Sequence, residues 1–205
     1  MTAQSKRSAV YLTSVQDVQM DPAVHSADVL TLAESHLKPS QQLHPNVLPN
    51  QLVQTFRCDR AQTAKGGVLT FVKDGLNAEQ VSQNIPELEA TIVDVKQKDL
   101  LIVTIYRQPG TVSVQKFLES VEELLSQEVF DTSNILVVGD FNEEVGGHTT
   151  GFFLQHGFVQ QPHGPTTDYG STIDHVYYKG ASSPQVQVVN TYYSDHDMLV
   201  VTFDM

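Results

Sequence analysis

Apolar residues gather in short runs bounded by polar residues, a pattern typical of β-strands. The clearest run is Ile135 to Val138, which is mostly β-branched and predicts a strand buried on both faces. Similar runs predict further strands over 28–33, 52–57, 67–73, 90–95, 100–106, 173–178, 186–189 and 198–203. The chain is therefore expected to be rich in strands.

A second periodicity, of three and four residues, predicts one long amphipathic helix. Its apolar members are Val114, Phe117, Leu118, Val121, Leu124 and Leu125. Glu119, Glu122 and Glu123 fall on the other side, and we interpret them as a solvated face and not as a metal site.

The remaining segments are short. A brief helix is expected within 15–24, ahead of Pro22, and another over 151–155, while 38–50 holds three prolines and two asparagines and predicts an irregular surface loop. No repeat or linker divides the chain, so a single domain over 1–205 is expected. Many strands with few helices fit an α/β arrangement of two packed sheets with helices outside.

Composition narrows the class of protein. A chain of 205 residues can bury a large core. No apolar run is long enough to cross a bilayer, and the N-terminus lacks the apolar core of a signal peptide. One cysteine, Cys58, excludes an internal disulfide and a cysteine-based zinc site. We therefore expect the cytosol or the nucleus, no membrane association and a monomer.

The charge balance is acidic. The chain carries 12 Lys plus Arg against 24 Asp plus Glu, a net charge of −12. Proteins that hold nucleic acid by its phosphates usually present a basic face. A polyanionic substrate must therefore be held locally here, by a few cations or by a bound metal.

The strand over 135–138 leads into a polar cluster. Gly139 is expected to end the strand, and Asp140 and Asn142 are two residues apart, so on an extended backbone their side chains share one face. A carboxylate and a carboxamide at the end of a buried strand form a candidate reaction centre. An ordinary Asp/Asn turn would produce the same residues.

Further strand ends carry acid, phenol or imidazole groups. They are Glu34 in LTLAE, Tyr106 in LLIVTIY, Asp174 in STIDHVYY, and Asp195 with His196 in YYSDHDMLV. If these ends converge, they can bind a divalent metal through oxygen ligands, orient a water and neutralise a phosphate. His175, next to Asp174, should point to the opposite face and is interpreted as structural.

With these motifs the sequence resembles the endonuclease/exonuclease/phosphatase superfamily, and most closely the endonuclease domains of non-LTR retrotransposons and related mobile elements. The matching pieces, from about residue 27 onward, are ADVLTLAESHL, KGGVLTFVK, LLIVTIYRQPG, ILVVGDFN, LQHGF, GPTTDYGSTIDHVYY and YYSDHDMLV. The resemblance implies a four-layer sandwich of two packed mixed β-sheets flanked by helices. It also implies Mg²⁺- or Mn²⁺-dependent hydrolysis of phosphodiesters, with nicking of DNA as the leading hypothesis.

The resemblance also implies catalytic roles. Asp140 would orient and deprotonate the attacking water, and Asn142 would fix that water or a phosphoryl oxygen. His196 would bind the scissile phosphate. Asp174 would accept a hydrogen bond from that imidazole and favour the imidazolium.

Three further residues are assigned by the resemblance to the phosphate and the metal. Tyr106 would donate a hydrogen bond to the phosphate or the nucleophile. Glu34 would bind the metal, and Asp195 would support the metal or its waters. These residue types suit phosphoryl transfer, which depends on positioning and charge neutralisation.

The chain departs from the family at one position. The family places an asparagine after the first strand, where it helps to hold the metal, but this chain has none before Asn46. Ungapped spacing falls at Arg7 and Ser8, and the end of an AVYL strand offers Thr13 or Ser14. This departure suggests a truncated N-terminal edge. Together with the net charge of −12, it leaves open an inactive descendant that acts as a binding module. A phosphoesterase for small molecules, which needs no long basic groove, is a further alternative.

Local positive charge is the last feature. Arg57, Arg60 and Lys65 fall in or beside one short loop, and Arg107 follows Tyr106 directly. We predict that these four cations form a phosphate-binding rim, although an ordinary solvated loop explains the clustering equally well.

Overall fold

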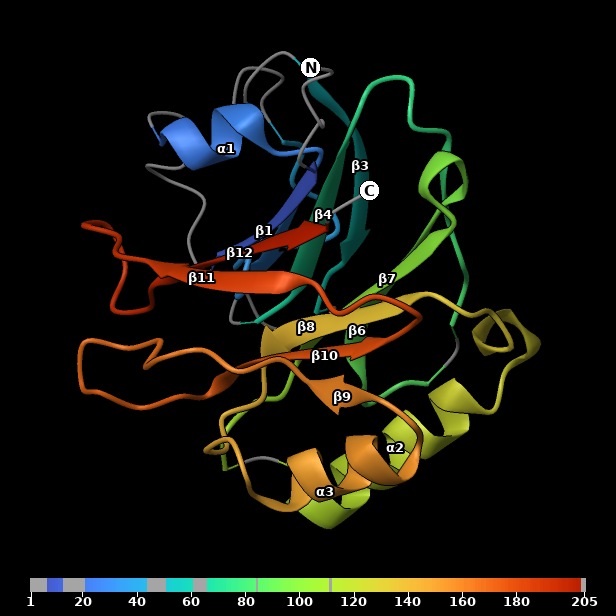
Figure 1. Ribbon diagram of the computed structural model, residues 1–205, viewed down its shortest axis with the longest axis vertical. Coiled ribbons are helices and arrows are strands. Elements are labelled where there is room, and N and C mark those ends of the chain that lie inside the picture. The colour runs from blue at the N-terminus through green and yellow to red at the C-terminus, as the bar shows by residue number, and fades with distance from the viewer. Residues whose placement is uncertain are drawn as a thin grey trace.

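Two β-sheets packed face to face form the centre of the molecule (Figure 1). The computed structural model describes residues 21–43, 51–60, 66–83, 85–110 and 112–203, and the backbone of 7–12. Within this part, α1 covers the outer side of one sheet, and α2 and α3 cover the outer side of the other. The predicted α/β sandwich of two sheets flanked by helices is therefore confirmed.

The first sheet is mixed. In spatial order its strands are β11 (Gln185–Val189), β12 (Met198–Phe203), β1 (Arg7–Leu12), β2 (Val29–Ala33), β4 (Val68–Lys73) and β3 (Leu52–Cys58). β1 and β2 run parallel, and the other neighbours run antiparallel. The AVYL segment thus forms a strand at the centre of this sheet.

The second sheet is mixed in the same way. In spatial order its strands are β5 (Ala78–Gln80), β6 (Glu89–Val95), β7 (Leu100–Tyr106), β8 (Ile135–Asp140), β10 (Asp174–Lys179) and β9 (Val159–Gln160). β7 and β8 run parallel. The edge strands β5 and β9 were not predicted, because they are short and carry no apolar run, so only pairing with a neighbour defines them.

The long predicted helix is present as α2 (Val114–Leu125), with Phe117, Val121 and Leu124 buried against the second sheet. α3 (His148–Gln155) begins three residues earlier than expected. Single 3₁₀ turns occur as η2 (Lys96–Lys98) and η3 (Glu128–Phe130). No helix in the described residues is long and apolar enough to cross a membrane.

The short helix expected within 15–24, ahead of Pro22, falls mainly on residues 15–20, which lie outside the described residues. α1 (Pro22–Ser26) begins at Pro22, and the side chain of Asp21 accepts a hydrogen bond from the Ala23 N–H at 2.8 Å. Proline suits the first helical position because no N–H is needed there, and aspartate is a favoured N-cap. The Asp-Pro pair therefore starts a helix.

Gly139 does not end the central strand, contrary to the sequence prediction. β8 continues through Gly139 to Asp140, and Gly139 pairs with Ile105 of β7. A Cβ at position 139 would lie 1.9 Å from the Ile105 carbonyl oxygen. The glycine is therefore required by the close approach of two parallel strands, and Asp140 is the last residue of β8.

Candidate active site

Strand register brings four chemically active side chains into one row at the end of the second sheet. Asp140 pairs with Tyr106 across β7 and β8 and with Asp174 across β8 and β10. Glu89 pairs with Tyr106 on the other side. Residues paired in this way direct their side chains to the same face. That face carries the apolar core between the two sheets, so the site closes one end of this core.

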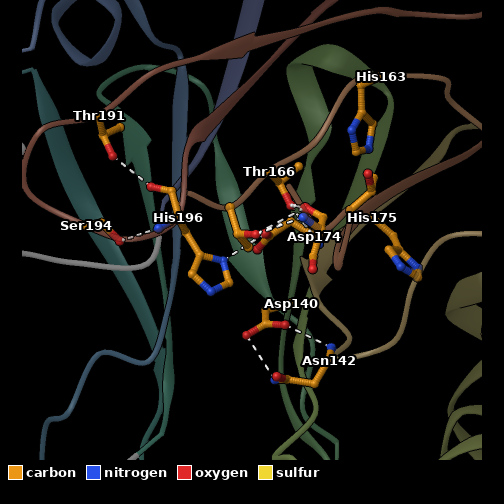
Figure 2. Close-up of polar contacts among 12 residues, drawn as sticks. Asp140, Asn142, His163, Thr166, Asp174, His175, Thr191, Ser194 and His196 are labelled. Carbon is orange, nitrogen blue, oxygen red and sulfur yellow. Dashed lines mark hydrogen bonds and ion pairs between the residues drawn. The ribbon is translucent and has the colours of Figure 1, made fainter. Parts of the chain in front are cut away.

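Asn142 holds the carboxylate of Asp140 (Figure 2). Its N–H donates to Asp140 Oδ1 at 2.9 Å, and its Nδ2 donates to Oδ2 at 3.0 Å. Nδ2 also donates to the Arg107 carbonyl at 2.9 Å, so protein atoms use both amide hydrogens. Asn142 has a φ of 47°, a left-handed conformation that asparagine tolerates better than most residues. The amide therefore positions Asp140.

His196 and Asp174 form a second pair. His196 Nδ1 donates to Asp174 Oδ2 at 2.8 Å, and the Asp174 side chain is fully buried. The loop also holds the backbone of His196, since its N–H donates to Ser194 Oγ at 3.1 Å and its carbonyl accepts from Thr191 Oγ1 at 2.7 Å. Nε2 remains the nitrogen that can donate to an incoming anion.

The charges of this group depend on one another. Burial alone lowers the pKa of His196, but the hydrogen bond and the charge of Asp174 outweigh burial and raise this pKa from 6.5 to about 9. Burial, and then the charge of Asp174, raise the pKa of Asp140 from 3.8 to about 7. At neutral pH His196 is therefore an imidazolium.

A contact between Glu34 and Tyr106 joins the two sheets at the candidate active site. Glu34 follows β2 of the first sheet, and Tyr106 ends β7 of the second. The Tyr106 hydroxyl donates to Glu34 Oε1, and His36 Nε2 lies 3.5 Å from the other oxygen. Burial first, and then the bond to Glu34, raise the pKa of Tyr106, so it remains a phenol that can donate. The charge of Glu34 also raises the pKa of Asp140. Glu34 therefore acts on the same electrostatic environment as Asp140.

The donor set fits a divalent cation. A carboxylate oxygen of Asp140, a carboxylate oxygen of Asp174 and a ring nitrogen of His196 lie within 4.8 Å of one another, and the protonated imidazole leaves the two carboxylates as the ligands of this group. Asp174 Oδ1 is buried and has no hydrogen-bond partner among the described residues. Carboxylate oxygens are the ligands that Mg²⁺ and Mn²⁺ prefer, and the surplus negative charge here would be relieved by a cation.

Asp195 lies on the solvent side of this group. Its side chain is exposed, and its charge raises the pKa of His196. Its carbonyl accepts from the Asp168 N–H at 3.0 Å. The structure thus places Asp195 beside the imidazole and outside the 4.8 Å group of ligand atoms.

The predicted cation rim is not one cluster. Arg57 binds Asp59 at 2.6 Å and the carbonyls of 38 and 41 at 3.0 and 2.9 Å, and Arg60 binds Glu89. Arg107 is buried and donates to the carbonyls of Phe141 and Asn142. Arg60 and Arg107 do line one cavity of about 500 Å³ beside Tyr106. Lys65 lies outside the described residues.

The family's missing asparagine cannot be placed among the described side chains. Thr13 and Ser14 lie outside the described residues. Arg7 and Ser8 belong to β1, and only their backbone is described.

The structure also reveals a supporting network that the sequence analysis did not identify. Glu143 accepts from the His148 and Thr149 N–H groups at 3.0 and 2.9 Å and so caps α3. His175 Nε2 donates to the Glu143 carbonyl at 2.7 Å, and the Tyr177 hydroxyl donates to His175 Nδ1 at 2.6 Å. The acidic pair directly after GDFN was a signal for the cap, but the partners in this network come from other parts of the chain.

His175 faces away from the candidate active site, in keeping with its structural interpretation. Figure 2 shows His175 and His196 on opposite sides of Asp174. The His175 ring stacks on Phe141, with the ring centroids 4.8 Å apart. The network therefore fixes the segment that follows Asp140 from its outer side.

Comparisons with known proteins agree with this geometry. The model of the "Endonuclease/Exonuclease/phosphatase family" matches residues 13–196. A search of curated proteins gave no match.

Solved structures share the fold at low sequence identity. The endonuclease domain of TRAS1, described as a telomere-specific non-LTR retrotransposon, aligns with a TM-score of 0.71 and 15% identity over 98% of this chain and 99% of that chain. An AP endonuclease from Archaeoglobus fulgidus aligns with a TM-score of 0.70 and 12% identity over 97% and 100%. D. rerio TDP2, complexed with single strand DNA product, aligns with a TM-score of 0.63 and 16% identity over 98% and 100%.

Proposed function

Because the chain belongs to the endonuclease/exonuclease/phosphatase family, we propose that it hydrolyses phosphodiesters with a divalent cation and nicks DNA as an endonuclease. The observation that carries this proposal is the meeting of Asp140, Asp174 and His196 within 4.8 Å at the end of the core between the sheets. These residues supply a base, an orienting acid and a cation for phosphate. Phosphoryl transfer needs this combination of positioning and charge neutralisation.

His196 and Asp174 act on the phosphate. The imidazolium donates from Nε2 to a non-bridging phosphate oxygen, while Nδ1 stays bound to Asp174 at 2.8 Å. This bond fixes the ring and preserves its positive charge. The developing negative charge of the transition state is stabilised at that position.

Asp140 acts on the water. Its carboxylate is oriented by both nitrogens of Asn142, so little reorganisation is needed before it accepts a proton. Tyr106 is a neutral donor in the same register row as Asp140 and can bind the nucleophile or a phosphate oxygen.

Glu34, with the carboxylates of Asp140 and Asp174 nearby, would hold Mg²⁺ or Mn²⁺. A bound ion supplies positive charge at the transferring phosphoryl group. Asp195, on the solvent side of His196, would support the hydration of this region.

The similar solved structures support DNA as the substrate and a mobile element as the origin. Two are endonucleases by their descriptions, one of them from a non-LTR retrotransposon, and the third was solved with single strand DNA product. Among the classes in the family name, endonuclease is therefore the one we assign to this chain.

The proposal is tested by incubating the protein with supercoiled plasmid and Mg²⁺ or Mn²⁺. The wild-type protein should convert supercoiled DNA to the nicked circle. Asp140→Asn and His196→Ala should each slow nicking by roughly 100-fold or more, because each removes one acid–base or charge-stabilising group. EDTA should stop the reaction.

Asp131→Asn is the matched control, because it removes an exposed carboxylate after η3 and should nick like the wild type. Absence of nicking by folded wild-type protein with either metal, or an Asp140→Asn variant as fast as the wild type, would reject the proposal. DNA binding without nicking would instead favour the binding module.

A second candidate is hydrolysis of a small phosphoester. The cavity of about 500 Å³ beside Tyr106 favours it, since Arg60, Lys116 and Ser113 line this cavity. A compact anion there would take Arg60 and Lys116 from their present partners in the same cavity, Glu89 and Glu87. A panel of inositol phosphates, nucleotides and other short phosphomonoesters, assayed beside plasmid, decides between the two candidates by the ratio of kcat/KM values.

A further inference from the structure

Two tyrosines on the described surface are almost fully exposed. Tyr169 is 85% exposed and Tyr192 is 101% exposed, whereas the other large apolar side chains classed as exposed reach only 54%. A single exposed apolar residue is ordinary on a soluble protein. What distinguishes this pair is that both rings lie on loops that meet at His196.

Tight backbone turns present both rings. The Gly170 N–H donates to the Thr167 carbonyl at 2.9 Å, which closes a turn with Tyr169 at its third position. The loop that carries Tyr192 is closed by the bond from Thr191 Oγ1 to the His196 carbonyl at 2.7 Å. Its neighbour Tyr193 packs among the buried residues beside α1. Because the loops are ordered by their own bonds, a ligand on these rings would lose little loop entropy.

The two loops are joined to each other and to the candidate active site. Thr167 forms an isolated β-bridge with His196, and the Asp168 N–H donates to the Asp195 carbonyl at 3.0 Å. Thr166 accepts from the Asp174 N–H at 3.3 Å through its hydroxyl (Figure 2). Tyr169 is therefore two residues from Thr167, which bridges to His196, and Tyr192 is four residues from His196 itself.

Most lysine and arginine side chains named for the described residues already bind a carboxylate or a backbone carbonyl of the protein itself. Lysine and arginine side chains within ion-pair distance of a carboxylate are Arg57, Arg60, Lys73, Lys96, Lys98 and Lys116. Arg107 is bound to backbone carbonyls. With a net charge of −12, phosphate contacts alone are a weak means of holding a nucleic-acid strand.

Stacking provides affinity that does not depend on charge. Every nucleobase has a π-face, and an aromatic side chain binds it in a manner that tolerates any base sequence. A base can stack on a protein ring only when it is unpaired and turned away from its neighbours. Exposed rings beside a phosphate site therefore select single-stranded or locally melted nucleic acid.

From this arrangement we infer that Tyr169 and Tyr192 are stacking surfaces for unpaired nucleobases of the strand whose phosphodiester lies at His196. The inference rests on the proposed function and narrows its substrate to single-stranded or locally unpaired nucleic acid. The tyrosines bind the substrate and do not take part in bond cleavage.

The test measures equilibrium binding by fluorescence anisotropy, in EDTA so that no cleavage occurs. The probes are a labelled single-stranded oligonucleotide and an abasic oligonucleotide of the same length and charge. The wild type should prefer the base-bearing strand by about 100-fold, which is about tenfold for each ring. The double variant Tyr169→Ala/Tyr192→Ala should lose this preference, and Tyr169→Phe/Tyr192→Phe should keep it.

Leu154→Ala is the matched control, because Leu154 is a 53% exposed apolar residue on α3. It should retain the wild-type preference. Equal binding of both strands by the wild type, or a preference that survives in the double alanine variant, overturns the inference.

Parallel plasmid nicking by the wild type separates the two proposals. Nicking without a preference for bases rejects only the stacking inference. A preference that the alanine variant abolishes, in a protein that cleaves no phosphodiester, supports the stacking surface and rejects the enzyme.

Discussion

Arg107 shows at the scale of one residue how a cation can serve the site without touching substrate. Its guanidinium donates to the carbonyls of Phe141 and Asn142, and its own carbonyl accepts from Asn142 Nδ2 at 2.9 Å. The two segments are thus bound in both directions. Arg107 is a positioning residue for the turn that carries Asp140.

Replacement of Arg107 by Gln should lower the free energy of unfolding by about 2–4 kcal/mol, because two largely buried carbonyls lose a charged donor. Nicking should slow as the turn loosens, and the salt dependence of DNA binding should not change. Chemical denaturation and a salt series measure the two effects.

Lys116→Gln is the control for Arg107, since Lys116 lines the same cavity but forms an exposed ion pair with Glu87. Exposed pairs contribute little to stability. If Arg107→Gln keeps wild-type stability and flattens the salt slope by about one, then Arg107 is the phosphate contact that the sequence suggested.

His175 gives stability a defined pH dependence. Burial lowers the pKa of His175 from 6.5 to about 4 in the folded protein. In the unfolded chain His175 therefore binds a proton as the pH falls below 6.5, whereas in the folded protein it stays neutral until about pH 4. Stability contributed by neutral His175 is complete above pH 6.5 and is lost as the pH falls toward 4, by about 3 kcal/mol in total.

Urea denaturation of the wild type and of His175→Gln at several pH values tests this dependence. Glutamine keeps one donor and one acceptor but does not titrate. The stability difference between the two proteins should shrink between pH 6.5 and pH 4. A constant difference across that range would show that His175 is not held neutral.

At the scale of elements, the approach of β7 to β8 depends on Gly139. A Cβ at position 139 would lie 1.9 Å from the Ile105 carbonyl oxygen. Neither strand can move away easily, because β7 and β8 are paired with each other inside the sheet. Gly139→Ala should therefore destabilise the protein by at least about 3 kcal/mol or prevent folding.

Gly151→Ala is the matched control, because a Cβ at position 151 in α3 meets nothing within 4 Å. This variant should be neutral or more stable by up to about 1 kcal/mol. Thermal unfolding of both variants makes the comparison. Equal melting temperatures would mean that β7 and β8 can separate at no cost.

β10 contributes side chains to both of its faces, one toward the other sheet and one toward the helices. Asp174 points into the space between the sheets and binds His196, while His175 points to the helix side and binds Glu143. Because side chains alternate along a strand, groups of the candidate active site and groups that support it can be adjacent in sequence and lie on opposite faces. A one-residue register shift would exchange them.

At the scale of the whole molecule, the net charge of −12 predicts a shallow salt dependence of nucleic-acid binding. A strand held by one to three phosphate contacts should give a log–log slope of about −1 to −3. Anisotropy titrations over a range of salt concentrations measure it. A slope steeper than about −6 would reveal an extended basic groove.

Arg60 is the member of the predicted rim that we expect to contribute to this slope. It lines the cavity beside Tyr106, although it also binds Glu89. Arg60→Gln should flatten the slope by about one. Lys96→Gln, which breaks a more exposed ion pair with Glu79 on β5, should leave the slope unchanged.

Local pattern in the sequence was sufficient to predict the strands other than the short edge strands β5 and β9, the long helix, and the ends at which Glu34, Tyr106, Asp140 and Asp174 lie. A short apolar run, or an apolar period of three and four residues, is a property of neighbouring residues, so it can be interpreted before any pairing is known. The same reasoning failed at Gly139, where the chain meets a partner strand.

Only the tertiary structure decided which of these strand ends meet, which side chains are charged and which partners the charged side chains bind. Strand register placed Tyr106, Asp140 and Asp174 in one row, and the hydrogen bond and charge of Asp174 raise the pKa of His196 against the effect of burial. The intramolecular partners of Arg57, Arg60 and Arg107 were equally invisible in the sequence. Register, desolvation and ion pairing depend on distances between residues far apart in the chain, and no local pattern carries that information.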